Sequence, residues 1–336
     1  MPEGKQGIGI DTISSVGGSL RASGDVAMRL LQANFNVNAL RTNEILRKDE
    51  WKLFDQAIVD VARKRLVGVG ALMSRGLTFN VNNALGTTQI EWERVSDMTP
   101  AEVSMSGVTD GQRDRLVFDL QTMPLPIIHK DFQLNIRHLS ASRTRGQPLD
   151  TMQAELCARI VSEKIEEILF KGLSMSVLGG SIAGLTTESN RNTGTVAASW
   201  ELPATAGTSK VDDVLAMIDA AISDNMYGPY GLFVTQKAYT LLADDYKPES
   251  DITQLNRLLQ IPGIEFILPS KDLAPDNIVL VQLSRDVVEI VNGMQPTLVQ
   301  WESHGGMQFN FKVMAIMVPR VRSTQTNQSG IVHYTT

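Results

Sequence analysis

Residues 77–122 constrain the fold more than any other part of the sequence. They hold three short stretches of β-branched and aromatic residues, at 77–81, 88–95 and 115–120, separated by Gly86, Pro100, Gly107 and Gly111. This pattern predicts a long antiparallel excursion of strands. Its apolar content is too low to bury a core of its own, so we expect it to project from the body and pack on another surface.

Two long amphipathic helices are predicted on either side of this excursion. In residues 47–66, Trp51, Phe54, Ile58, Ala62 and Leu66 recur at helical spacing on one face, and Gly68 and Gly70 are expected to end the helix. Residues 150–171 form the second helix, with Asp150 as its cap and Gly172 as its stop. A strand-like stretch at 127–139 lies between the excursion and this helix.

The second half of the chain predicts a small α/β lobe. A helix begins near Ser209, where Asp212 completes a possible capping box. Strands are then expected at 230–235, 264–268 and 277–283, with helices at 236–245 and 252–260. Strands at 298–302 and 307–319 and a polar tail close the chain.

Composition narrows the class of protein. The chain has 336 residues, 43% of them hydrophobic, which predicts two lobes or an elongated subunit of several parts. A formal net charge of −6 argues against tight, salt-sensitive binding to nucleic-acid phosphates. The single cysteine, Cys157, excludes an internal disulfide framework. We expect neither a signal peptide nor a membrane span, because the apolar runs are too short.

Catalytic and ligand-binding motifs are weak throughout. Residues 179–186 have the glycine spacing of a phosphate-binding loop, but Leu185 stands where the lysine belongs, so an ordinary flexible turn is favoured. Cys157 lies among apolar residues of a predicted helix, which favours core packing over nucleophilic chemistry. His129, His138, His304 and His333 lack metal-ligand spacing. We therefore expect no catalytic, cofactor or metal site, and an α/β enzyme that uses the 179–186 loop is kept as a minor alternative.

Residues 1–46 are rich in glycine, serine and asparagine, with only 25–33 predicted as helix. Such a segment cannot pack a core of its own. It predicts an arm that needs a neighbouring surface.

Four segments resemble encapsulin shell proteins, in the same order along the chain. Residues 47–67 resemble their N-terminal helix, 124–134 the strand after their extended loop, 163–172 with Gly184 and Leu185 the end of their spine helix, and 227–230 a turn of their axial lobe. This resemblance covers about residues 47–321. It implies an α+β fold, that of tailed-phage major capsid proteins, with an N-terminal arm, an extended loop, a peripheral domain and an axial domain.

The resemblance also implies the division of the chain. The arm is expected at 1–46, the N-terminal helix and entry to the peripheral domain at 47–75, the extended loop at 76–122, the peripheral domain with its spine helix at 123–208, the axial domain at 209–296, and the return strands and tail at 297–336. No lysine occurs between Lys64 and Lys130, so an isopeptide crosslink from a loop lysine, known in some relatives, is not available.

The function implied is structural, that of a major capsid subunit and not an enzyme. Copies would form the hexamers and pentamers of an icosahedral shell around double-stranded DNA, without sequence-specific binding and without a membrane. Scaffold, portal and cement proteins are possible partners, and the location implied is the virion capsid, assembled in the host cytoplasm. The arm and the tail favour a phage capsid over the alternative, an encapsulin compartment that encloses a cargo enzyme.

The expected contacts between subunits lie on the first helix and on the excursion. The candidate residues are Trp51, Phe54, Trp92, Met98, Met105, Arg113 and Arg115. For Trp51 and Phe54, packing inside their own subunit is an equally weighted alternative.

Overall fold

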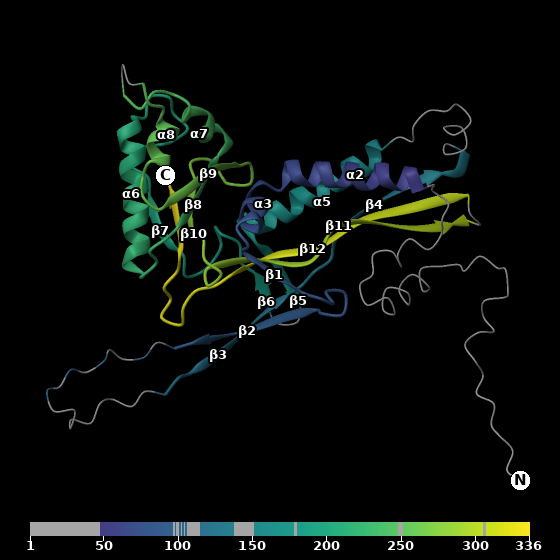
Figure 1. The fold of residues 1–336 in the computed structure, drawn as a ribbon, viewed down its shortest axis with the longest axis horizontal. Coiled ribbons are helices and arrows are strands. Elements are labelled where there is room, and N and C mark those ends of the chain that lie inside the picture. Colours follow the sequence, from purple (N-terminus) through teal and green to yellow (C-terminus); the bar gives the residue numbers. More distant parts are fainter. Residues whose placement is uncertain are drawn as a thin grey trace, which may run out of the picture.

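The computed structural model describes residues 48–96, 98, 101, 103, 105, 115–137, 151–177, 180–247, 251–304 and 307–336. The predicted arm and its helix at 25–33 lie outside these residues. Figure 1 shows two lobes side by side, with a two-stranded ribbon projecting away from both.

The first lobe packs helices on one face of a sheet. Helices α2 (Lys48–Arg65) and α5 (Met152–Lys171) lie side by side, and α3 (Val67–Ser74) follows α2 (Figure 1). The sheet beneath them has the order β1 (Thr78–Asn80), β11 (Val288–Ser303), β12 (Gln308–Val321) and β4 (Ile128–Asn135). Both long predicted helices are confirmed, within two residues at each end.

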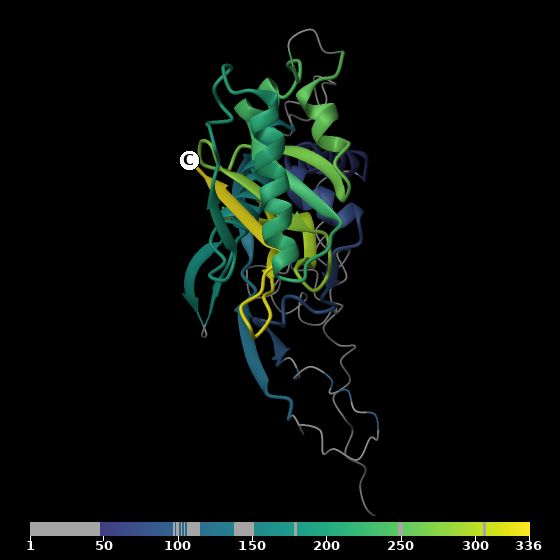
Figure 2. The same cartoon turned by 90° about the vertical axis from the view of Figure 1, so that its left-hand side faces the viewer.

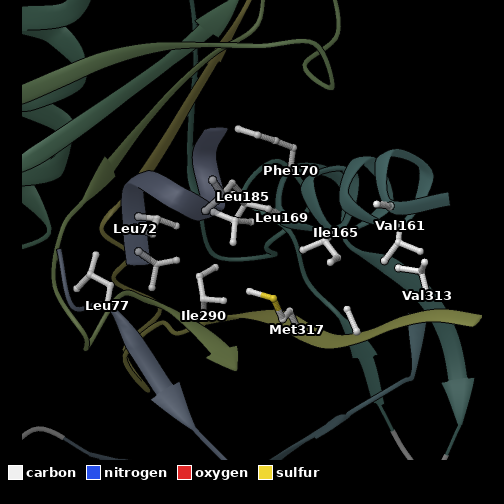
Figure 3. Packing of buried hydrophobic residues seen from close by; sticks show 14 of the residues in the cluster. Leu72, Leu77, Val161, Ile165, Leu169, Phe170, Leu185, Ile290, Val313 and Met317 are labelled. Carbon is white, nitrogen blue, oxygen red and sulfur yellow. The ribbon is translucent and has the colours of Figure 1, made fainter. Parts of the chain in front are cut away.

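The core of this lobe lies between the helices and the sheet. Figure 3 shows Val161, Ile165 and Leu169 of α5 meeting side chains of the strands below, such as Val313 and Met317 of β12. Burying one such side chain stabilises the fold by about 1.5–3 kcal/mol. The apolar stripe of α5 therefore fixes which face of this helix lies on the sheet.

The second lobe is built on a five-stranded sheet. Its order is β7 (Asn192–Thr195), β13 (Ile331–Thr335), β10 (Ile278–Gln282), β8 (Tyr230–Thr235) and β9 (Ile264–Ser270). Figure 2 shows α6 (Gly207–Ser223) lying across one face of this sheet. Two short helices, α7 (Gln236–Leu241) and α8 (Gln254–Leu259), complete the lobe and confirm its α/β character.

The ribbon consists of β2 (Gln89–Val95) and β3 (Phe118–Pro124), paired antiparallel. It confirms the antiparallel pairing predicted for 88–95 and 115–120 and the projection of these strands from the body (Figure 1). The strand predicted at 77–81 is not part of the excursion, because it is β1, which pairs parallel with β11 in the sheet of the first lobe. A second, smaller hairpin, β5 (Leu173–Val177) with β6 (Gly180–Ile182), lies close to the base of the ribbon.

Three further local predictions are wrong. Helical structure continues past Gly68 and Gly70 as α3, because the carboxylate of Glu166 accepts the backbone N–H of Gly68 at 2.6 Å and of Val69 at 3.3 Å. A Cβ on Gly68 would lie 2.8 Å from Glu166 Oε1, so this close approach requires glycine.

The other two concern α6 and the C-terminus. Helix α6 begins at Gly207 with Ala206 as its N-cap and no side-chain cap bond, so the Ser209 and Asp212 capping box does not form. The predicted polar tail contains β13, whose first three residues are buried between β7 and β10. For α5, the N-cap residue is Thr151, and the predicted cap Asp150 lies outside the described residues.

Candidate subunit-contact surface

The ribbon has two chemically different faces. Residues directly opposite each other on antiparallel strands point to the same side of a sheet. One face carries the pairs Ile90 with Met123, Trp92 with Gln121, and Arg94 with Asp119, and all six side chains are buried or half-buried against the body. This inward face therefore anchors the ribbon to its own subunit.

The outward face carries exposed apolar side chains. Val95 lies opposite Phe118, and Glu93 lies opposite Leu120. Val95 is 44% exposed, Phe118 58% and Leu120 56%. Val117, just before β3, is also exposed. A free two-stranded ribbon in water would carry polar residues here, so the exposed apolar side chains of Val95, Phe118 and Leu120 on this face, with Val117 next to Phe118 in sequence, mark an interaction surface. We call these four residues the ribbon patch.

An ion pair crosses the ribbon close to the outer end of its paired strands. Arg94 Nη2 lies 2.8 Å from Asp119 Oδ2, and the amide of Gln121 donates to the same oxygen. The hydrogen bond from Arg94 is the main cause that lowers the pKa of Asp119. The guanidinium of Arg320 lies 5.9 Å from the ring centroid of Trp92, so the inward face also contacts β12. These contacts orient the ribbon as it leaves the body.

The candidate contact residues on the excursion are placed as follows. Trp92 is half-buried on the inward face of the ribbon, while Met98, Met105 and Arg115 are exposed. Arg113 lies outside the described residues. The ribbon patch is not among the predicted contacts, although residues 115–120 contain three consecutive apolar residues, Leu116, Val117 and Phe118.

For the first helix, the prediction for Phe54 as a contact between subunits is wrong. Its side chain is fully buried within its own subunit. Its ring centroid lies 5.8 Å from that of Phe311, which in turn stacks on Phe132 at 4.9 Å. The alternative, intrasubunit packing, holds for Phe54. Trp51 belongs to α2, but its side chain lies outside the described residues.

From Gly180 onward, where the structure describes it, the glycine-rich loop does not have the geometry of a phosphate-binding loop. The backbone N–H of Leu185 donates to Leu169 O at 2.9 Å, and the N–H of Thr186 donates to Phe170 O at 2.9 Å. The loop thus satisfies carbonyl groups at the C-terminal end of α5, the negative end of the helix dipole. A phosphate is bound instead at the N-terminal end of a helix.

Two other candidates for chemistry, Cys157 and His333, are buried side chains. Cys157 is buried, and burial raises the pKa of its thiol, which confirms core packing over nucleophilic chemistry. His333 is buried on β13, and burial together with Arg191 lowers the pKa of its imidazole. Among the described residues, no cluster of three or more His, Cys, Asp or Glu side chains is suited to holding a metal ion. In the same part of the chain, no helix combines the length and hydropathy of a membrane span.

Comparison with known proteins gives the same fold. The Type 1 encapsulin shell protein EncA of Myxococcus xanthus is 24% identical over 282 residues, 82% of this chain and 90% of that protein. The solved virus-like particle from Pyrococcus furiosus has a TM-score of 0.61 at 16% identity, over 84% of this chain and 98% of that chain. The capsid of Myoviridae phage XM1 has a TM-score of 0.60 at 10% identity, over 78% and 90% of the two chains.

A protein-family model described as a family of unknown function, DUF6260, matches residues 38–334. This match spans almost the whole chain, including both lobes and the ribbon. The α+β fold and its phage and encapsulin relatives agree with the resemblance seen in the sequence. The chain therefore belongs to the DUF6260 family of unknown function, and it has the fold of tailed-phage capsid and encapsulin shell proteins.

Proposed function

We propose that this chain is a structural subunit, many copies of which assemble into a closed icosahedral shell. The observation that carries the proposal is the ribbon patch, which projects from the body with its apolar side chains exposed. The shared fold and the encapsulin relative support it. In this proposal the ribbon of one subunit lies on a neighbouring subunit, and the same contact repeats around the shell.

The energy of such a contact is modest in each subunit and large in the shell. Completing the burial of one half-exposed Leu or Phe contributes on the order of 1 kcal/mol. Four such side chains are a small part of an interface. Each subunit places its ribbon on one neighbour and binds the ribbon of another, so the number of contacts grows with the number of subunits. Because a single contact is weak, a misplaced subunit can dissociate during assembly.

The division of the chain into capsid domains is also a proposal. The ribbon and its tip correspond to the extended loop at 76–122, the lobe of α2 and α5 to the peripheral domain, and the five-stranded lobe to the axial domain. Sheet order adds β7 and β13 to the axial lobe, because both strands pair within its sheet. The C-terminal segment would thus return to the axial domain after the strands of the peripheral domain.

The finer proposal is a tailed-phage major capsid protein that encloses double-stranded DNA as hexamers and pentamers within the virion. It is supported by the similarity to the capsid of phage XM1 and by the segment 1–46, which precedes the first helix and suits an arm that reaches a neighbour. Scaffold, portal and cement proteins would be its partners, and assembly would take place in the host cytoplasm.

An encapsulin compartment is the second candidate. The Myxococcus xanthus relative, an encapsulin shell protein similar over 82% of this chain, favours it. In that case the shell would enclose a cargo protein instead of a genome. The net charge of −6 is compatible with both containers, because neither requires the shell to condense DNA by charge.

The experiment that tests the proposal is negative-stain electron microscopy of the protein expressed alone, beside analysis of the contents of shells purified from the native source. Uniform closed particles are expected. Double-stranded DNA inside native shells would support the phage capsid, and a single abundant protein inside them would support the encapsulin. A chain that stays monomeric, also with a candidate scaffold protein added, would overturn the shell proposal.

A further inference from the structure

Helix α5 carries a row of apolar side chains on its solvent-facing side. Met152, Leu156 and Ile160 recur every four residues and therefore share one face of the helix. Met152 is 62% exposed, Leu156 43% and Ile160 44%. We call these three residues the α5 stripe. A row of exposed apolar side chains along one helix is typical of a surface that another segment covers.

The α5 stripe leads into a cavity of about 430 Å³ beside the helix. Ile160 and Val161 of α5 and Ile128 of β4 form its apolar lining. Glu163 and Lys271, which pair at 3.1 Å, also line it. The stripe and the cavity together suit an amphipathic helix that lies along α5 and places an apolar side chain in the cavity.

Helices α2 and α5 run parallel, with their N-terminal ends together. Arg65 of α2 lies 3.7 Å from Glu163 of α5, and Gly68, just past α2, donates to Glu166. Both pairs are 98 positions apart in sequence, so the two helices lie in register along their length (Figure 1). The chain that precedes α2 therefore enters the subunit at the end of α5 where the stripe begins.

The predicted helix at 25–33 has the pattern required to cover this stripe. Leu30 and Leu31 belong to its apolar side. Its polar residues recur at helical spacing on the opposite side, and they are Asp25, Arg29 and Gln32. The segment has nine residues, as has the stretch 152–160, so as helices both are about 12 Å long.

The connection between this segment and α2 is long enough for docking within one subunit. Residues 34–47, extended, span up to about 46 Å, whereas α5 is about 30 Å long. Such a tether holds the segment at an effective concentration in the millimolar range, which favours its own α5 over that of a neighbour. Residues 1–24 precede the segment, so an arm docked in this way still has chain that extends to a neighbour.

We propose that residues 25–33 dock as an amphipathic helix on the α5 stripe of their own subunit, with an apolar side chain in the cavity beside Ile160. The docked helix would bury the exposed side chains of the stripe. It would also fix the position from which residues 1–24 leave the subunit. The docking takes place within one chain, so it does not depend on assembly of a shell.

Disulfide cross-linking in the full chain tests the docking. L30C with L156C places one cysteine on the segment and one on the stripe. Mild oxidation should link them within one chain, which gives a monomer of faster mobility in non-reducing electrophoresis. L30C with L202C is the matched control and should stay unlinked, because Leu202 is 54% exposed on a turn outside α5. The native thiol, Cys157, is buried, and the single variants L30C and L156C measure any link to it.

Labelling of L156C with a small maleimide gives a second measurement, which does not require the two cysteines to be in register. In the otherwise native chain, labelling should be about tenfold or more slower than in L30D/L156C, because an aspartate on the apolar side of the segment opposes docking. Q32D/L156C is the matched control. Gln32 belongs to the polar side, so this variant should label as slowly as L156C alone.

A link within one chain, with slow labelling that L30D accelerates, is the expected result. If the cross-link does not form because the cysteines are out of register, the labelling rates decide. Cross-linked dimers would overturn the proposal, because the arm would then cover the α5 of a neighbour. Fast labelling of L156C would overturn it as well. Slow labelling that L30D leaves unchanged would also overturn it, because another segment or molecule would then cover the stripe.

Discussion

Glu289 on β11 and Arg320 on β12 are direct cross-strand partners, and both side chains are buried. Arg320 Nε lies 3.1 Å from Glu289 Oε2, and Arg322 donates to the same oxygen at 2.9 Å. The guanidinium of Arg320 also lies 4.3 Å from the ring centroid of Phe79 on β1. One carboxylate thus holds two cations where β1, β11 and β12 meet.

Replacing Glu289 should therefore destabilise the subunit strongly. E289Q leaves Arg320 buried without a counter-charge, and the expected loss is about 3–5 kcal/mol in the free energy of unfolding, measured by urea denaturation. E265Q is the control: it breaks the exposed pair of Glu265 with Arg75 and should cost about 1 kcal/mol or less. Equal losses in the two variants would contradict the role given to Glu289.

Phe54 and its neighbour Leu53 make a second test of the core. F54A removes a fully buried ring from the stack with Phe311 and Phe132, and should cost about 3–5 kcal/mol. Leu53 is 46% exposed on the same helix, so L53A should cost much less. Thermal unfolding of both variants measures the difference. A larger loss for L53A would mean that the helix is rotated from the position described.

Glu166 should make the stability of the subunit depend on pH. Burial raises the pKa of its carboxyl group to about 7 from an ordinary value of 4.5, although the N–H groups of Gly68 and Val69 oppose the shift. Asp272 raises this pKa further and Lys271 lowers it. Protonation therefore favours the folded state. This contribution is complete below about pH 4.5 and is lost as the pH rises through about 7.

The variant E166Q should remove that part of the pH dependence. The glutamine oxygen still accepts the N–H of Gly68, but the side chain stays neutral. Between pH 5 and pH 8 the wild type should lose on the order of 3 kcal/mol more stability than E166Q. The midpoint of urea unfolding at the two pH values gives the result. E167Q is the control, because Glu167 is paired with Lys164 at the surface and the hydrogen bond from Lys164 lowers the pKa of its carboxyl group.

Much of the fold could be predicted from the sequence because the main signals are local. The stripe of Phe54, Ile58 and Ala62 marks the buried face of α2, and helical spacing gives α5 in the same way. The predictions failed where a residue or strand that is distant in sequence determines the local structure. α3 depends on Glu166, which lies about 98 residues away in sequence from Gly68. The short β13 becomes a strand because β7 and β10 lie on either side of it.

The contact surface was harder to predict for a related reason. The sequence of β3 alone does not show which of its alternating residues face the body, because the register of its pairing with β2 determines this. Trp92 is one of the predicted contacts, yet its side of the ribbon faces the body. For Phe54 the sequence leaves contact and core packing equally open, and only the position of β12 shows that Phe311 covers its ring.

Sedimentation velocity of ribbon variants tests the central claim most directly. The wild-type chain is expected to sediment as large, uniform particles. L120D and F118D place a charge in the ribbon patch, and each should yield small, folded species with unchanged circular dichroism. L202D, at a leucine that is 54% exposed outside the ribbon, should assemble like the wild type. If L120D and F118D assemble as well as L202D does, the ribbon patch is not a contact between subunits and the account is wrong.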